Sequence, residues 1–314
     1  MATKLKLLPY ILLLIHSVII GLSYIFVKLS MQYAETFDVL AQRFSLAFLC
    51  CAIYNLLRRP DMRFTRRDLI RLLPLGLLYP ISFFLLQIFG LRYASAMQTG
   101  LVTSVAPVIT LIFARYLIQE PIRRRQVIGV LVAVAGVVLL QLMNLSQAEV
   151  GESVGFLLVF LSVFVMSLNI VLTRAYTKDY SWEKITTYII TLSWLVFNAI
   201  ALGRHLVLGE WGSFFWPLLS PEYLLVLAFL GILSSFGTSL ITAYALSQVA
   251  SVPVAVFASF SPLVTIISSI WILREPVGWY HLVGGLMITL GALITNLSKA
   301  KRSTDGLHER NLSG

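Results

Sequence analysis

Long apolar runs separated by short polar stretches dominate the chain. A membrane-spanning helix needs about 20 mostly apolar residues to cross a hydrocarbon core about 30 Å thick, because each residue adds about 1.5 Å. The runs that reach this length lie near residues 7–28, 38–57, 70–91, 95–118, 126–143, 154–173, 184–203, 222–246, 250–273 and 279–297. The pattern therefore predicts an all-α membrane protein with ten transmembrane helices.

Composition indicates the same class of protein. Hydrophobic residues make up 58% of the chain, charged residues make up 12%, and the mean hydropathy is +0.87. These values are typical of a protein embedded in a lipid bilayer. The first apolar run follows Lys4 and Lys6, but it is too long for a signal peptide and lacks a small-x-small cleavage pattern. Cys50 and Cys51, the only cysteines, are adjacent and indicate neither a disulfide framework nor a metal site.

The net charge of +10 is distributed along the chain in a way that predicts orientation. If the N-terminus is cytoplasmic, the loops on that side hold 18 of the 24 lysines and arginines. Basic residues concentrate on the cytoplasmic side of membrane proteins, so both ends are predicted to be cytoplasmic in a cytoplasmic membrane. The same distribution argues against nucleic acid as a partner, because topology already accounts for the basic clusters.

One segment of the chain occurs twice. PVITLIFARYLIQEP, at Pro107–Pro121, recurs as PLVTIISSIWILREP at Pro262–Pro276, an offset of 155 positions. We therefore predict a first five-helix repeat over residues 1–148, a second over 149–298, and a polar cytoplasmic tail over 299–314.

An odd number of spans in each half predicts that the second repeat enters the membrane in the opposite orientation. The loop RRPDMRFTRR is strongly basic, whereas its counterpart GEWGSFFWPLLSPE offers tryptophan and phenylalanine to the outer interface. Two inverted five-helix repeats are the architecture of alternating-access transporters, and a passive scaffold has no need of inversion. The pattern favours a secondary transporter.

Two stretches resemble the repeat of the drug/metabolite transporter superfamily, EamA type. They are GLRYASAMQTGLVTSVAPVITLIFARYLIQEPIRRRQVIGVLVAVAGVVLL and AYALSQVASVPVAVFASFSPLVTIISSIWILREPVGWYHLVGGLMITLGALI. The motif SYIFVK, ending at Lys28, and Arg43 in LAQRFSLAF resemble further family positions. The resemblance implies ten spans and transport of small metabolites, often amino acids. We expect export.

Candidate solute-binding residues combine aromatic, amide and hydroxyl groups on predicted helix faces. They are Ser17, Tyr24, Arg43, Tyr79, Phe83, Gln87, Gln98, Asn169, Ser235 and Thr238. Such a mixture suits a small amphipathic solute, of which an aromatic or aliphatic amino acid is the leading candidate. Arg43 lies about 7.5 Å into its span after Asp38 at helical rise. Snorkelling to the outer interface, pairing inside the bundle and binding a solute carboxylate all remain open for it.

Other ionisable and helix-breaking residues have structural interpretations. Glu120 and Glu275 precede prolines where spans end and begin, so they are predicted to cap helix starts rather than carry protons. His16 is interpreted as a packing histidine in preference to a proton relay. Pro107 and Pro262 lie mid-span at equivalent positions and are predicted to kink both spans, which indicates a central site.

Three alternatives to amino acid transport differ in chemistry. Efflux of cationic drugs would use the same architecture, a membrane-embedded enzyme would need clustered acid, base or metal ligands, and a scaffold would move no solute. Neither a nucleotide-binding loop nor a metal fingerprint occurs in the sequence, so we expect no cofactor and no enzymatic activity. The expected partners are a small-molecule solute and the bilayer, and the oligomeric state stays unassigned.

Overall fold

The structure is a computed structural model that describes residues 2–60, 63–103, 105–119, 124–145, 150–209, 211–258, 260–274 and 278–297. Over these residues it is helical and contains no strand, as the apolar runs predicted. The first half of the chain forms α1 (Ala2–Ser30), α2 (Thr36–Arg58), α3 (Arg66–Gly76), η1 (Leu77–Ser82), α4 (Phe83–Tyr93), α5 (Ala96–Thr103), α6 (Ala106–Ile118) and α7 (Arg124–Leu145). The second half forms α8 (Val150–Tyr176), α9 (Trp182–Leu208), α10 (Trp211–Phe215), η2 (Trp216–Leu219), α11 (Pro221–Ala228), η3 (Phe229–Gly237), α12 (Thr238–Gln248), α13 (Ser251–Ala258), α14 (Ser261–Ser268), η4 (Ser269–Leu273) and α15 (Trp279–Leu297).

Every predicted span coincides with one helix or with a run of consecutive helices. Among the described residues, seven such stretches are long and apolar enough to cross a membrane. They are Leu8–Ser30, Thr36–Arg58, Arg66–Tyr93, Ala96–Ile118, Ser153–Tyr176, Trp182–Leu208 and Pro221–Gln248. The remaining predicted spans correspond to α7, to α13 with α14 and η4, and to α15.

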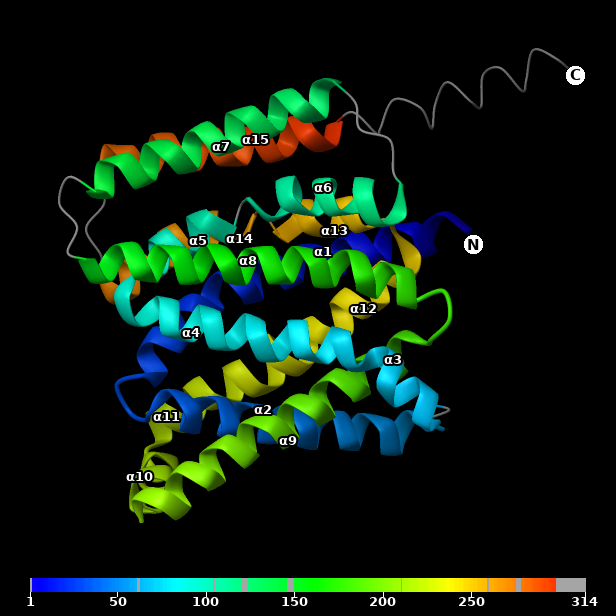
Figure 1. Cartoon of the computed structure of the whole chain (residues 1–314), viewed down its shortest axis with the longest axis vertical. Helices are drawn as coiled ribbons and strands as arrows, with labels where there is room; N and C mark the ends of the chain where they lie inside the picture. The colour runs from blue at the N-terminus through cyan, green and yellow to red at the C-terminus, as the bar shows by residue number, and fades with distance from the viewer. Residues whose placement is uncertain are drawn as a thin grey trace, which may run out of the picture.

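The long helices lie side by side along one direction (Figure 1). α7 and α15 pack on each other as a layer at one edge of the bundle, and α2 packs on α9 at the opposite edge. A Cβ atom added to Gly136 of α7 would lie 2.8 Å from the Gly284 carbonyl oxygen of α15. Glycine therefore permits this close approach of the two helices.

The two ends of the bundle differ in composition. We call the end where α2 begins, α9 ends and α10 lies the α10 end (Figure 1). At the other end α3 and α9 begin, and α3 starts with Arg66 and Arg67. We call this the basic end. A capping box starts α3 there, in which the Thr65 hydroxyl accepts from the Asp68 amide and the Asp68 carboxylate accepts from the Thr65 amide.

Helix breaks recur at the same 155-residue offset as the sequence repeat. α5 and α13, which begin at Ala96 and Ser251, have equal lengths, and α6 and α14 begin ten residues after them. Gln119 and Arg274, also 155 positions apart, both have left-handed backbones with φ of 56° and 54°. Packing is reciprocal as well, because α1 packs on α14 as α8 packs on α6.

The prolines of these breaks begin helices. Pro107 lies in the first turn of α6 and Pro262 in the first turn of α14, where proline costs no hydrogen bond. The interruption is thus a pair of half-helices rather than one bent helix. The predicted caps Glu120 and Glu275 lie outside the described residues.

Candidate functional site

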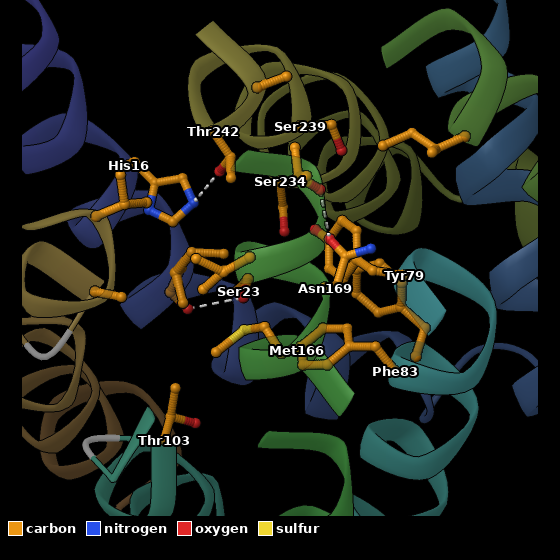
Figure 2. A pocket seen from close by; sticks show the side chains of 18 of the residues that line it. His16, Ser23, Tyr79, Phe83, Thr103, Met166, Asn169, Ser234, Ser239 and Thr242 are labelled. Carbon is orange, nitrogen blue, oxygen red and sulfur yellow. Dashed lines mark hydrogen bonds between the residues drawn. The ribbon is translucent and has the colours of Figure 1, made fainter. Parts of the chain in front are cut away.

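A cavity lies at the centre of the bundle, between helices of both halves (Figure 2). α1, α4, α5, α8, α9, α12 and α13, with η1 and η3, supply its walls. The polar side chains that line it are His16, Ser23, Tyr24, Tyr79, Gln87, Thr103, Asn169, Thr173, Ser234, Ser239 and Thr242. Phenylalanine, methionine and aliphatic side chains cover the remaining surface. The described lining contains no carboxylate, lysine or arginine.

Much of the lining comes from equivalent positions of the two repeats. The pairs that differ by 155 are Tyr79 and Ser234, Phe84 and Ser239, Gln87 and Thr242, and Thr103 and Ala258. In each pair the first half contributes the larger side chain. The cavity therefore has related backbones on two sides but one bulky, partly aromatic wall and one small, hydroxyl-rich wall.

Helix irregularities place these residues. Tyr79 precedes a proline and has an extended backbone, with φ −135° and ψ 126°, which interrupts the run of α3 and α4. Ser234 and Ser239 of the second half, which line the cavity five positions apart, have the spacing of the π-type turns of η3. In the first half the extended Tyr79 interrupts the helix, and Phe83 and Phe84 line the cavity after it.

Hydrogen bonds tie polar lining groups across helices. The Tyr24 hydroxyl of α1 and the Thr103 hydroxyl of α5 are 2.7 Å apart, and the His16 Nε2 atom of α1 is 3.1 Å from the Thr242 hydroxyl of α12. Figure 2 shows the second contact at the cavity wall. His16 Nδ1 is buried and has no partner among the described residues. His16 therefore joins α1 to α12 through one ring nitrogen, and its other ring nitrogen has no hydrogen-bond partner among the described residues.

Asn169 connects the cavity to α3. Its Nδ2 atom donates to the Leu75 carbonyl at 3.0 Å, and its Oδ1 atom accepts from the Thr173 hydroxyl at 3.2 Å. The Leu75 carbonyl lies just before the break in the α3 run, where backbone groups lose their regular helical partners. The Asn169 side-chain amide thus satisfies a carbonyl at the helix break while it lines the cavity.

Arg43 lies directly behind the cavity wall and is only 1% exposed. Its Nη2 atom donates to the Ser234 hydroxyl at 2.8 Å, its Nε atom donates to the Ser235 hydroxyl, and its guanidinium carbon lies 4.1 Å from the centre of the Phe84 ring. Ser234 and Phe84 both line the cavity. Burial excludes snorkelling, because a snorkelling head group would be exposed. Among the described residues no carboxylate pairs with Arg43.

Five of the ten candidate residues line the cavity, namely Tyr24, Tyr79, Phe83, Gln87 and Asn169. Arg43 and Ser235 lie behind its wall, as described above. The Ser17 hydroxyl donates to the Leu13 and Phe257 carbonyls, and the Thr238 hydroxyl donates to the Ser234 carbonyl. The Ser17 and Thr238 hydroxyls are thus bonded to backbone carbonyls of the helices.

Gln98 has a different position from the one expected. It caps the start of α5. Its Oε1 atom accepts from the Ser95 backbone amide, and its backbone amide donates to the Ser95 hydroxyl, each at 3.0 Å. This is a capping box of the Ser-x-x-Gln form, which the sequence itself contains. Gln98 does not line the described cavity.

Comparison with known proteins identifies the family. The pattern of the EamA-like transporter family matches residues 7–142 and, a second time, residues 153–297. The chain belongs to the EamA-like transporter family. It is therefore a multi-pass membrane protein and a transporter, which confirms the resemblance seen in the repeats.

Relatives with the same overall length support this membership. The chain is 35% identical over 294 residues to the uncharacterized transporter YcxC of Bacillus subtilis (strain 168), covering 94% of each chain. It is 24% identical over 288 residues to an uncharacterized transporter of Archaeoglobus fulgidus, covering 91% of this chain and 96% of the relative. A crystal structure shares its fold with a TM-score of 0.65 at 15% identity, over 96% of this chain and 98% of the other.

Proposed function

We propose that this EamA-family protein is a ten-span secondary transporter whose two five-helix repeats are inverted. The recurrence of helix breaks at the 155-residue offset and the reciprocal packing of α1 on α14 and α8 on α6 support a duplicated fold. The basic end, with Arg66 and Arg67, is the cytoplasmic end under the positive-inside rule, and the α10 end is the outer end. Exchange of two related packings would open the central cavity alternately to each side.

We propose that the solute is small, amphipathic and bears a carboxylate, with aromatic or aliphatic amino acids as the leading class. One observation carries this choice, the buried Arg43 that has no carboxylate partner among the described residues. Removing a cation from water costs several kcal/mol unless an anion compensates it. A solute carboxylate reaching past Ser234 would supply that anion, and the aromatic wall would hold the apolar part of the solute.

The same observation argues against cationic drugs as the solute class. The described lining offers no carboxylate to a cation, and Arg43 raises the electrostatic potential behind the wall. The positive charge of Arg43 repels a cationic drug. It attracts the carboxylate of a zwitterion that faces it.

Counterflow in liposomes that contain only this protein tests the proposal. Labelled phenylalanine and leucine would be compared with their carboxamides, which keep the side chain and amine but lack the carboxylate, and with a cationic drug. We expect exchange of the free amino acids and little exchange of the carboxamides. Equal exchange of acid and amide would contradict the carboxylate site, and exchange of the cationic drug alone would indicate a drug transporter instead.

A further inference from the structure

A second buried cluster of ionisable groups lies at the α10 end, away from the cavity lining. Asp38 of α2 is 0% exposed and His205 of α9 is 2% exposed. His205 Nε2 lies 2.8 Å from Asp38 Oδ1, so α2 and α9, from opposite halves of the chain, are joined by this contact. Carboxylate and imidazole are 167 positions apart in sequence, and neither belongs to the solute cavity.

The pair has unused hydrogen-bonding capacity. Asp38 Oδ2 and His205 Nδ1 are both buried, and neither has a hydrogen-bond partner among the described residues. Leaving two such atoms unpaired is costly in a permanent structural pair. Either atom can accept a proton without breaking the existing contact, because the contact uses Oδ1 and Nε2.

Among the described residues, few charged or titratable groups surround the pair. Arg204 of α9 places Nη1 3.8 Å from Asp38 Oδ1, and its side chain is 30% exposed. The Tyr223 hydroxyl of α11 donates to Gln42 of α2 rather than to Asp38. The residues of α10 that face the pair are uncharged aromatics, and Arg92 of α4 pairs with Glu35 at the surface. When His205 is neutral, the negative charge of Asp38 and the positive charge of Arg204 cancel. An added proton therefore gives the cluster a net positive charge.

A pocket adjoins the buried pair. His205 lines a second pocket at the α10 end, together with Trp194, Asn198, Trp211 and Phe214. The ring centres of His205 and Trp211 lie 5.6 Å apart. A proton from the α10 side would use this pocket, which shares no lining residue with the cavity.

We propose that Asp38 and His205 form a proton-binding site that couples proton uptake from the α10 side to solute binding. Arg43 lies on the same helix five residues beyond Asp38, about 7.5 Å along its axis. Neutralising the carboxylate, or charging the imidazole, increases the positive potential at Arg43 and strengthens the attraction for an anionic group. Proton and carboxylate solute then bind together, which favours uptake over the export expected from the sequence. This inference rests on the proposed carboxylate site for its coupling step.

The first test measures the proton site alone, without transport. Tryptophan fluorescence of the detergent-solubilised protein would be followed between about pH 5 and pH 8, where histidine side chains titrate. An imidazolium ring quenches an adjacent indole, so we expect quenching toward acid in the wild type and its loss in His205→Gln. That variant keeps an amide donor near the Nε2 position but cannot titrate. Identical titration curves for wild type and His205→Gln would overturn the proton site.

The second test measures coupling. The half-saturation concentration for phenylalanine exchange would be determined at mildly acidic and mildly alkaline pH on the α10 side. We expect tighter binding at acidic pH in the wild type, and no pH effect in Asp38→Asn or His205→Gln. His281→Gln is the matched control, because His281 is also buried but bonds to the Gly278 amide, and its pH profile should stay that of the wild type.

The outcomes separate the two proposals. If the wild type exchanges phenylalanine and both folded variants keep its pH profile, coupling through Asp38 and His205 is refuted while the transport function stands. If Asp38→Asn does not fold, His205→Gln decides. If no solute exchanges, the proposed function fails, and the fluorescence titration still supports or refutes the proton site.

Discussion

Replacing Arg43 by methionine should abolish preference for the carboxylate while leaving the fold intact. The guanidinium makes two hydroxyl contacts and one ring contact but no ion pair among the described residues. A buried ion carries a desolvation penalty of several kcal/mol, which an apolar side chain of similar volume does not. We therefore expect the thermal unfolding midpoint of Arg43→Met to equal or exceed that of the wild type.

The loss of solute affinity should be large. A hydrogen bond to a charged group contributes about 1.5–3 kcal/mol, which corresponds to about 10- to 150-fold in the dissociation constant. Arg43→Met should weaken phenylalanine binding by this factor and leave the carboxamide unchanged. Arg43→Lys keeps the charge but cannot span Ser234 and Ser235 together, so we expect an intermediate loss.

Binding and exchange assays on the same reconstituted variants decide the matter. Arg92→Met is the matched control, because Arg92 is 41% exposed and pairs with Glu35 at the surface. Its half-saturation concentration should equal that of the wild type. An unchanged constant in Arg43→Met would refute the carboxylate site. An equal loss for phenylalanine and its carboxamide would show instead that Arg43 only supports the cavity wall.

Three further predictions concern packing and the basic end. Gly136→Leu should lower the unfolding midpoint, because overpacking costs about 1–3 kcal/mol, whereas Gly203→Leu in open surroundings should not. Asp68→Asn and Lys184→Met should each lower the midpoint, and the double variant should lose less than the sum of the two, because these side chains form a 2.9 Å ion pair between α3 and α9. Asn169→Leu should lower the midpoint by leaving a helix-break carbonyl unpaired, and calorimetry in detergent would measure it.

The positions of the helices follow from hydropathy alone, because lipid leaves no alternative to long apolar helices. The helix breaks were also predictable, since one sequence offset relates Pro107 to Pro262 and the structure preserves that relation at their helix starts. On the regular helix α1 the 3.6-residue period placed Tyr24 and Ser17 on one face, and only Tyr24 lines the cavity.

Lining residues near the π-type turns were missed for a physical reason. A regular period groups Ser235 with Thr238, whereas the wider turn of η3 directs Ser234 and Ser239 into the cavity. The sequence repeat offered a signal, because the predicted Tyr79 maps onto Ser234 by the 155-residue offset. The contact of Asp38 with His205 had no such signal, since helix packing alone brings them together.

The two repeats have similar backbones but different side chains at the cavity, and this difference affects how the solute lies. Two similar repeats allow two packings of comparable free energy, which alternating access requires. The lining does not share this symmetry, since Tyr79 and Phe84 occupy the positions that Ser234 and Ser239 occupy in the second repeat. Arg43 donates to the hydroxyl of Ser234 and lies against the Phe84 ring, so the carboxylate should point to this part of the lining and the apolar group away from it. One orientation of the solute is then favoured whichever end of the cavity is open.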